Sequence, residues 1–236
     1  MIATAEPKSK YRKSHTWLCD ALLELGLGES VYATGVPWST YTGLADFRDE
    51  HRSGVRITFD QGRIELVSPR YRHEKPISRL VRVISQLARA FNQPFQTART
   101  TTLRQEGAEK GLEPDDCCYL ANAPAIQNVE DIDLDVHPPP DLAIEVDSTN
   151  SSVPKEPIFA SMGVPELWRF KDKTVVIRLL GADRQYVTSA NSLAFPPITS
   201  ESLTKLLRET DTKFDENEAD DFFRAWAMAQ KLAATS

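Results

Sequence analysis

The chain of 236 residues is poor in the residues on which zinc sites, disulfide scaffolds and membrane spans depend. Its three cysteines, Cys19, Cys117 and Cys118, show neither metal-ligand nor disulfide spacing, and an odd number favours a reducing cytosol. The four scattered histidines include no pair at the spacing of helical metal ligands, which argues against a zinc enzyme. No apolar run reaches the roughly 18 residues of a membrane-spanning helix, and the N-terminus lacks an apolar stretch suited to a signal peptide. We therefore expect a cytoplasmic protein with no membrane partner.

The sequence also contains no internal repeat, low-complexity tract or glycine-rich phosphate loop. Its hydrophobic content of 41% and charged content of 26% are ordinary for a soluble protein. The net charge of −6 means that binding to nucleic acid would require a local basic surface. From length and composition we expect a loose polar arm at residues 1–13 and one domain at residues 14–236.

Hydrophobic periodicity predicts an α/β fold built around one central mixed sheet. Helical spacing marks residues 17–25, 75–91 and 222–233, and Pro76 fits the first turn of the second of these helices. Alternating patterns around turns predict hairpins at residues 55–66 and 166–180. Residues 94–103 are also predicted as a strand, and Glu113 and Asp116 are expected to face solvent. The order of elements is typical of a mixed sheet flanked by helices, with an N-terminal helical extension.

The stretch from Pro140 to Lys155 carries the densest group of acids on a predicted strand. Apolar Leu142, Ile144 and Val146 alternate with Asp141, Ala143, Glu145 and Asp147. Because side chains alternate between the two faces of a strand, three carboxylates are expected on one face. Crowded carboxylates repel one another unless a cation lies between them, and carboxylate oxygens are ligands that Mg²⁺ prefers. A strand end with acids and a nearby lysine therefore suggests a metal site, although we expect Asp141 to cap or orient the strand.

A basic run precedes and enters the predicted helix at residues 75–91. From Arg70 to Arg89 there are six basic residues and one acid, Glu74. A solvated helix face is the usual explanation of such a run, and a surface for the phosphate backbone is the functional one. On the functional interpretation the nucleic-acid contacts are Arg72, Lys75, Arg79 and Arg82. Glu74 either serves the helix dipole or points towards the strand acids.

Asp115 at a strand start, Glu145 on the acidic strand and Lys155 shortly after it form a possible phosphodiesterase set. Hydrolysis of a phosphodiester needs cations that offset charge in the transition state and that generate hydroxide at neutral pH. Two carboxylates from neighbouring strands can hold Mg²⁺, and a lysine can position the attacking water or stabilise the developing negative charge.

The same residues lie in four stretches that together resemble a known family. These are residues 62–69 followed by His73-Glu74, residues 111–116, residues 139–147 and residues 163–168. Over roughly residues 41–227, the chain resembles the family of putative restriction endonucleases within the PD-(D/E)XK nuclease superfamily.

The resemblance implies a restriction-endonuclease-like fold that cleaves DNA with Mg²⁺, for which Mn²⁺ can substitute. It implies catalytic roles for Glu74, Asp115, Glu145 and Lys155, and metal contacts from Asp115, Glu145 and Asp147. Asp147 stands where the superfamily carries its lysine, and the resemblance places that lysine at Lys155. The open alternatives are a non-catalytic binding module and a hydrolase of small phosphoesters. Cutting two antiparallel strands would suit a homodimer.

Overall fold

The computed structural model describes residues 16–147, 151–211 and 215–235, with the side chains of residues 71–73 left out. The expected arm at residues 1–13 therefore lies outside the described residues. The helices are α1 (Trp17–Glu24), α2 (Trp38–Glu50), α3 (Tyr71–Ala90), α4 (Ala123–Ile126), α5 (Glu156–Met162), α6 (Ser200–Asp211) and α7 (Glu216–Thr235), with a short 3₁₀ turn η1 (Glu106–Ala108).

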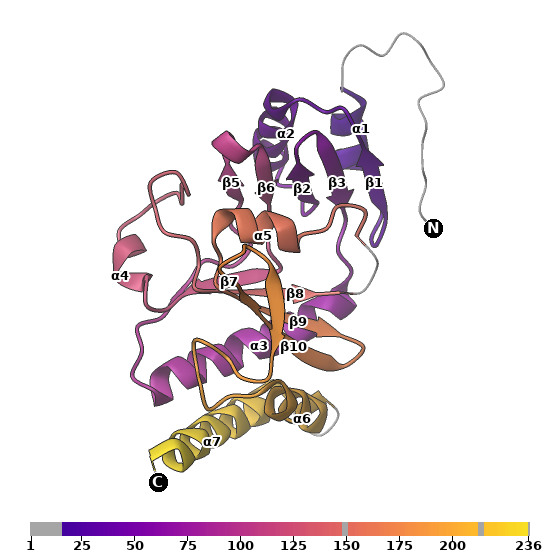
Figure 1. Cartoon of the computed structure of the whole chain (residues 1–236). Helices are drawn as coiled ribbons and strands as arrows, with labels where there is room; N and C mark the ends of the chain where they lie inside the picture. Colours follow the sequence, from indigo (N-terminus) through magenta and orange to yellow (C-terminus); the bar gives the residue numbers. More distant parts are fainter. Residues whose placement is uncertain (1–15, 148–150, 212–214, 236) are drawn as a thin grey trace.

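The strands form two sheets rather than the one that the sequence predicted (Figure 1). The N-terminal sheet has the order β1 (Ser30–Ala33), β3 (Arg63–Val67), β2 (Arg56–Asp60), β6 (Lys110–Leu112) and β5 (Leu103–Gln105). The C-terminal sheet has the order β11 (Tyr186–Ser189), β10 (Thr174–Leu180), β9 (Glu166–Lys171), β8 (Leu142–Val146), β7 (Asp116–Tyr119) and β4 (Gln96–Thr97). Among the described strands, β8 and β9 are the only parallel pair, so the second sheet is mixed, as expected.

Both predicted hairpins form because their turns can adopt left-handed backbone conformations. Gln61 and Gly62 join β2 to β3 with φ of 47° and 85°, and Asp172 and Lys173 join β9 to β10 with φ of 50° and 60°. Two consecutive positive φ angles are what a type I′ turn requires, and that turn matches the twist of paired strands.

The predicted strand at residues 94–103 is wrong, because the chain crosses there from one sheet to the other. Arg99 has φ of 53°, and the N–H groups of Ala98 and Arg99 both donate to the carbonyl of Cys117. This turn ends β4, which pairs with β7, before β5 begins and pairs with β6. Local alternation does not distinguish one strand from two short ones joined by such a turn.

Strand β8 lies between two helical layers, which explains its alternating pattern. Leu142 and Ile144 pack in one core with α3, α6 and α7, whereas Ala143 packs in a second core with Ile158 and Phe159 of α5. Figure 1 shows α3, α6 and α7 on one side of the C-terminal sheet and α5 on the other. Glu145 belongs to the same strand face as Ala143, so its side chain points towards the α5 side of the sheet.

The prediction that Glu113 and Asp116 face solvent is wrong, since both are buried. Glu113 forms an ion pair with Arg48, and it accepts hydrogen bonds from the Ile57 N–H and, at 3.2 Å, from the Thr102 hydroxyl. These contacts join α2 to the N-terminal sheet. None of the described helices combines the length and the apolar character that a bilayer crossing requires.

Helix α7 is part of the core, and a substitution at Phe223 tests how much this helix contributes to stability. Its ring is fully buried in the cluster that includes Ile144. We expect Phe223→Ala to lower the free energy of unfolding by about 3–5 kcal/mol, because a buried ring is replaced by a cavity. Met228→Ala on the exposed side of α7 is the matched control and should change stability little. Denaturant unfolding measures both, and a small effect of Phe223→Ala would show that α7 is only loosely attached.

Candidate functional site

A cavity of about 650 Å³ lies where the N-terminal sheet, the C-terminal sheet and α5 meet. Its lining includes Arg56 and Glu65 from the N-terminal sheet, together with Asp115 and Glu145 from the C-terminal sheet region and Lys155 before α5. The cavity reaches the carboxyl end of β8, where β8 pairs in parallel with β9. Carboxyl ends of parallel strands are the usual place for ligands in open α/β sheets.

Asp115 is held between a backbone group and a cation. Its Oδ2 accepts a hydrogen bond of 2.6 Å from the Val146 N–H, which ties the start of β7 to the end of β8. Its Oδ1 forms an ion pair with the Arg56 guanidinium from β2. The other terminal nitrogen of Arg56 lies 3.5 Å from Oε1 of Glu74. Arg56 thus joins two of the acids predicted for the site.

Glu145 lies beside Lys155, as a shared site would require. The Lys155 Nζ donates to Glu145 Oε2 over 2.6 Å from the N-cap position of α5. Oε1 of Glu145 is buried and has no hydrogen-bond partner among the described residues. Burial raises the pKa of Glu145, and the ammonium of Lys155 opposes this only in part. The site therefore contains a buried carboxylate oxygen to which none of the described residues donates a hydrogen bond.

Asp147 lines the same cavity as Asp115 and Glu145, but a cation of β9 holds its carboxylate. Its Oδ2 lies 2.5 Å from Arg169 of β9, and Arg169 also reaches Glu156 at 2.7 Å. Within the described part of the chain, no group of three or more His, Cys, Asp or Glu side chains is arranged to hold one metal ion. The cation that holds Asp147, Arg169, belongs to the neighbouring strand β9. The residue pattern of β8 alone therefore could not predict this ion pair.

Glu74 lies at the edge of the site rather than inside it. It occupies the first turn of α3, and its side chain is 49% exposed. Its ion pair with Arg56 connects it to the other acids of the site. The sequence placed Glu74 on the inward face of the helix, whereas the structure leaves it half in solvent.

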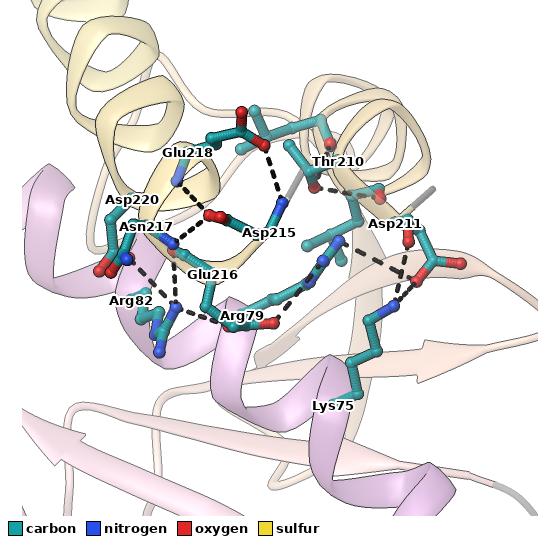
Figure 2. Close-up of polar contacts among 12 residues, drawn as sticks. Lys75, Arg79, Arg82, Thr210, Asp211, Asp215, Glu216, Asn217, Glu218 and Asp220 are labelled. Atoms are coloured by element: carbon teal, nitrogen blue, oxygen red, sulfur yellow. Dashed lines mark hydrogen bonds and ion pairs between the residues drawn. The ribbon is translucent and has the colours of Figure 1, made fainter. Parts of the chain in front are cut away.

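The basic side of α3 is covered by the C-terminal helices (Figure 2). Lys75 pairs with Asp211 at 2.9 Å, and Arg82 pairs with Glu216 at 2.6 Å. Arg79 is only 3% exposed and lies 3.8–4.0 Å from carboxylates of Glu216 and Asp211. These basic residues of α3 therefore contact acids of the C-terminal helices, and they do not form a fully solvated helix face.

The role of Lys75, Arg79 and Arg82 in DNA binding stays a prediction. Arg72 was predicted with them, but its side chain lies outside the described residues.

Two cavity residues, Arg56 and Glu65, were not assigned to the site from the sequence. Glu65 is 3% exposed on β3 and accepts hydrogen bonds from the hydroxyl of Ser151 and, at 2.9 Å, from the N–H of Ser152. It thereby holds the segment that leads to Lys155. The sequence signals were that both residues occupy polar positions of the β2–β3 hairpin and that Glu65 lies in the stretch 62–69 of the family resemblance.

Asp116, next to the site, makes stability depend on pH. Burial raises its pKa to about 6 from the usual 3.8. The folded state then binds the proton more tightly than the unfolded state, so the free energy of unfolding falls as pH rises from about 4 to about 6. Asp116→Asn should remove about 1–3 kcal/mol of this fall and be more stable than the parent at pH 7. Urea unfolding from pH 4 to 7 measures it, and identical pH slopes would contradict the assignment.

No curated protein matches the sequence. A family model described as a putative restriction endonuclease matches residues 38–208, which is most of the chain. The matched region includes every strand of the C-terminal sheet and all of the cavity residues Arg56, Asp115, Glu145 and Lys155. The chain therefore belongs to the putative restriction endonuclease family, Uma2.

Proposed function

We propose that this protein is a DNA endonuclease that hydrolyses phosphodiester bonds with Mg²⁺, and that Mn²⁺ can replace Mg²⁺. The observation that carries the proposal is the convergence of Asp115, Glu145 and Lys155 in one cavity. These residues come from the start of β7, the end of β8 and the entry to α5. Membership of a restriction endonuclease family supports a nuclease function.

The residues present fit a divalent cation that is held by two carboxylates. Oε1 of Glu145 is buried without a hydrogen bond among the described residues, and such an atom is costly unless a donor or a cation meets it. Mg²⁺ commonly takes only one or two protein carboxylates and keeps several waters, so a third acid is not required. Asp115 would supply the second carboxylate through Oδ1, which now faces Arg56.

Arg56 has an alternative partner that would free Asp115. Its guanidinium already lies 3.5 Å from Glu74, which is exposed enough to follow it. If Asp115 held the ion, Glu74 would be the partner for Arg56, so Glu74 would support the site without being a ligand. Asp147 would contribute through water, because its own carboxylate is held by Arg169.

A bound divalent ion would lower the pKa of a water molecule and offset charge on the phosphate. Lys155 acts beside it. Its ammonium, 2.6 Å from Glu145, can orient the attacking water or stabilise the negative charge that develops on the phosphoryl oxygens. The superfamily position for this lysine is Asp147, and Arg169 neutralises that acid so that it does not repel the phosphate.

A non-catalytic DNA-binding module is the second candidate. One observation favours it: Asp115 and Glu145 each already have a cation partner in the chain, Arg56 and Lys155. The site could then be a stable set of ion pairs that never admits a metal.

A reducing cytosol and a homodimer remain part of the main proposal. Cys19, Cys117 and Cys118 are free thiols, which supports the reducing compartment.

The proposed homodimer follows from the need to cut two antiparallel strands. Light scattering of the protein with and without duplex DNA measures its mass, and a monomer under both conditions contradicts the dimer.

Metal-induced stabilisation separates these candidates. Millimolar Mg²⁺ or Mn²⁺ should raise the melting temperature, because the ion binds only the folded state. Asp115→Asn and Glu145→Gln should abolish this shift, although each lowers the metal-free stability by removing the partner of Arg56 or Lys155. Glu130→Gln, at an exposed acid in the connection before β8, is the matched control and should keep the shift.

Lys155→Ala should behave differently from the ligand variants. It should keep the metal shift and lower the rate of plasmid cleavage by about 10²-fold or more, because it removes a group that acts on the transition state. A wild-type protein that binds duplex DNA but shows neither a metal shift nor plasmid cleavage would be the binding module. A wild-type protein with no shift in either metal would contradict the proposed site.

Replacing Arg56 tests its competition with the ion. Arg56→Gln leaves Asp115 without its cation, so the metal-free protein should lose about 1–3 kcal/mol of stability. The metal should then raise the melting temperature by more than it does in the parent, since no guanidinium has to be displaced. Calorimetric melting with and without Mn²⁺ gives both quantities. An equal or smaller shift in the variant would mean that Arg56 does not occupy the position of the ion.

A further inference from the structure

The cavity wall is more basic than the rest of this acidic protein. Six Arg or Lys side chains and five carboxylates line it, a balance of +1 in a chain of net charge −6. Four of the six cations belong to β9, β10 and the turn before β11. We call these the hairpin cations: Arg169, Lys171, Arg178 and Arg184.

Two of the hairpin cations are held in place by one acid. Glu156, at the start of α5, lies 2.7 Å from Arg169 and 3.1 Å from Arg178. Both guanidinium groups keep part of their surface in solvent, with 35% and 23% of the side chain exposed. An arginine whose position is already fixed loses little conformational freedom when it binds a phosphate.

The other two hairpin cations carry charge that the chain does not match. Lys171 is exposed at the end of β9 and forms no ion pair with any described residue. Arg184 is exposed in the turn between β10 and β11, and its hydrogen bond goes to the carbonyl of Ala160 rather than to an acid. A carbonyl does not neutralise a guanidinium, so both charges are available to an anion.

The register of the C-terminal sheet places this surface next to the site. Arg169 is the direct partner of Glu145 across the β8–β9 pair. The cations of α3 are placed differently, because α3 packs on the opposite sheet face, with Leu142 and Ile144. There Lys75 and Arg82 already pair with acids of the C-terminal helices.

We propose that the phosphate backbone of the nucleic acid lies along the hairpin cations, and that Lys171 and Arg184 make its outer contacts. This inference rests on the proposed function, since it names the surface that presents the substrate to Glu145 and Lys155. Arg169 and Arg178 receive phosphates nearer the carboxylates. The surface recognises charge on the backbone and carries no base specificity.

Equilibrium binding tests this surface without any need for catalysis. The full chain is titrated against a labelled DNA duplex in EDTA, at several salt concentrations. Lys171→Ala with Arg184→Ala should weaken binding about 10- to 100-fold near 0.1 M salt and reduce the slope of log K against log [salt] by about 2. Lys205→Ala with Arg224→Ala removes the same charge from exposed positions on α6 and α7, and should keep both the affinity and the slope.

Three outcomes would overturn the inference. The first is an unchanged slope in the Lys171→Ala, Arg184→Ala protein at a parental melting temperature. The second is a loss of slope only in a Lys75→Ala, Arg82→Ala protein, which would place the backbone on α3. The third is a wild-type protein that binds no duplex at low salt.

A separate cleavage assay distinguishes a failure of this inference from a failure of the proposed function. Salt-dependent binding through the hairpin cations without cleavage in Mg²⁺ or Mn²⁺ refutes the nuclease and supports the surface. Cleavage by a hairpin variant that keeps its affinity and slope refutes the surface alone.

Discussion

The need to compensate two buried carboxylates is the constraint on which the structure of the site depends. Asp115 and Glu145 are both buried, and an ionised carboxylate out of water is costly unless a cation accompanies it. Arg56 comes from the N-terminal sheet and Lys155 from the entry to α5, so both elements must close on β8 to provide these charges. The cavity is the space that remains where they meet. The same cations that stabilise the fold also surround the place proposed for the ion.

The C-terminal sheet separates two groups of cations that have different partners. On one side, Lys75 and Arg82 of α3 pair with acids around the start of α7, a segment beyond the family match that ends at residue 208. On the other side, Lys171 and Arg184 line the cavity without a carboxylate partner among the described residues. An acidic chain can therefore still offer a phosphate surface, because its acids and bases are distributed unevenly.

Much of the fold follows from local patterns, whereas the partners of the charged residues do not. The hairpin turns, helix α3 and the alternating faces of β8 were predictable because turn chemistry and periodicity are local. The convergence of Lys155 on Glu145 was expected from their closeness in the sequence and from the family resemblance, whereas periodicity alone did not predict it. Arg56 and Glu65 were missed because their contacts join different sheets and distant segments. Periodicity likewise gave no sign that acids of α7 would cover the basic side of α3.

We infer that Asp115 and Glu145 together hold a divalent cation. The most direct measurement is anomalous diffraction from crystals of the full chain soaked in Mn²⁺, recorded beside crystals in EDTA. We expect a manganese peak in the cavity beside the carboxylates of Asp115 and Glu145, with the Arg56 guanidinium moved from Asp115 towards Glu74. The absence of a peak, with Arg56 still on Asp115, would contradict it and leave the cavity as a set of structural ion pairs.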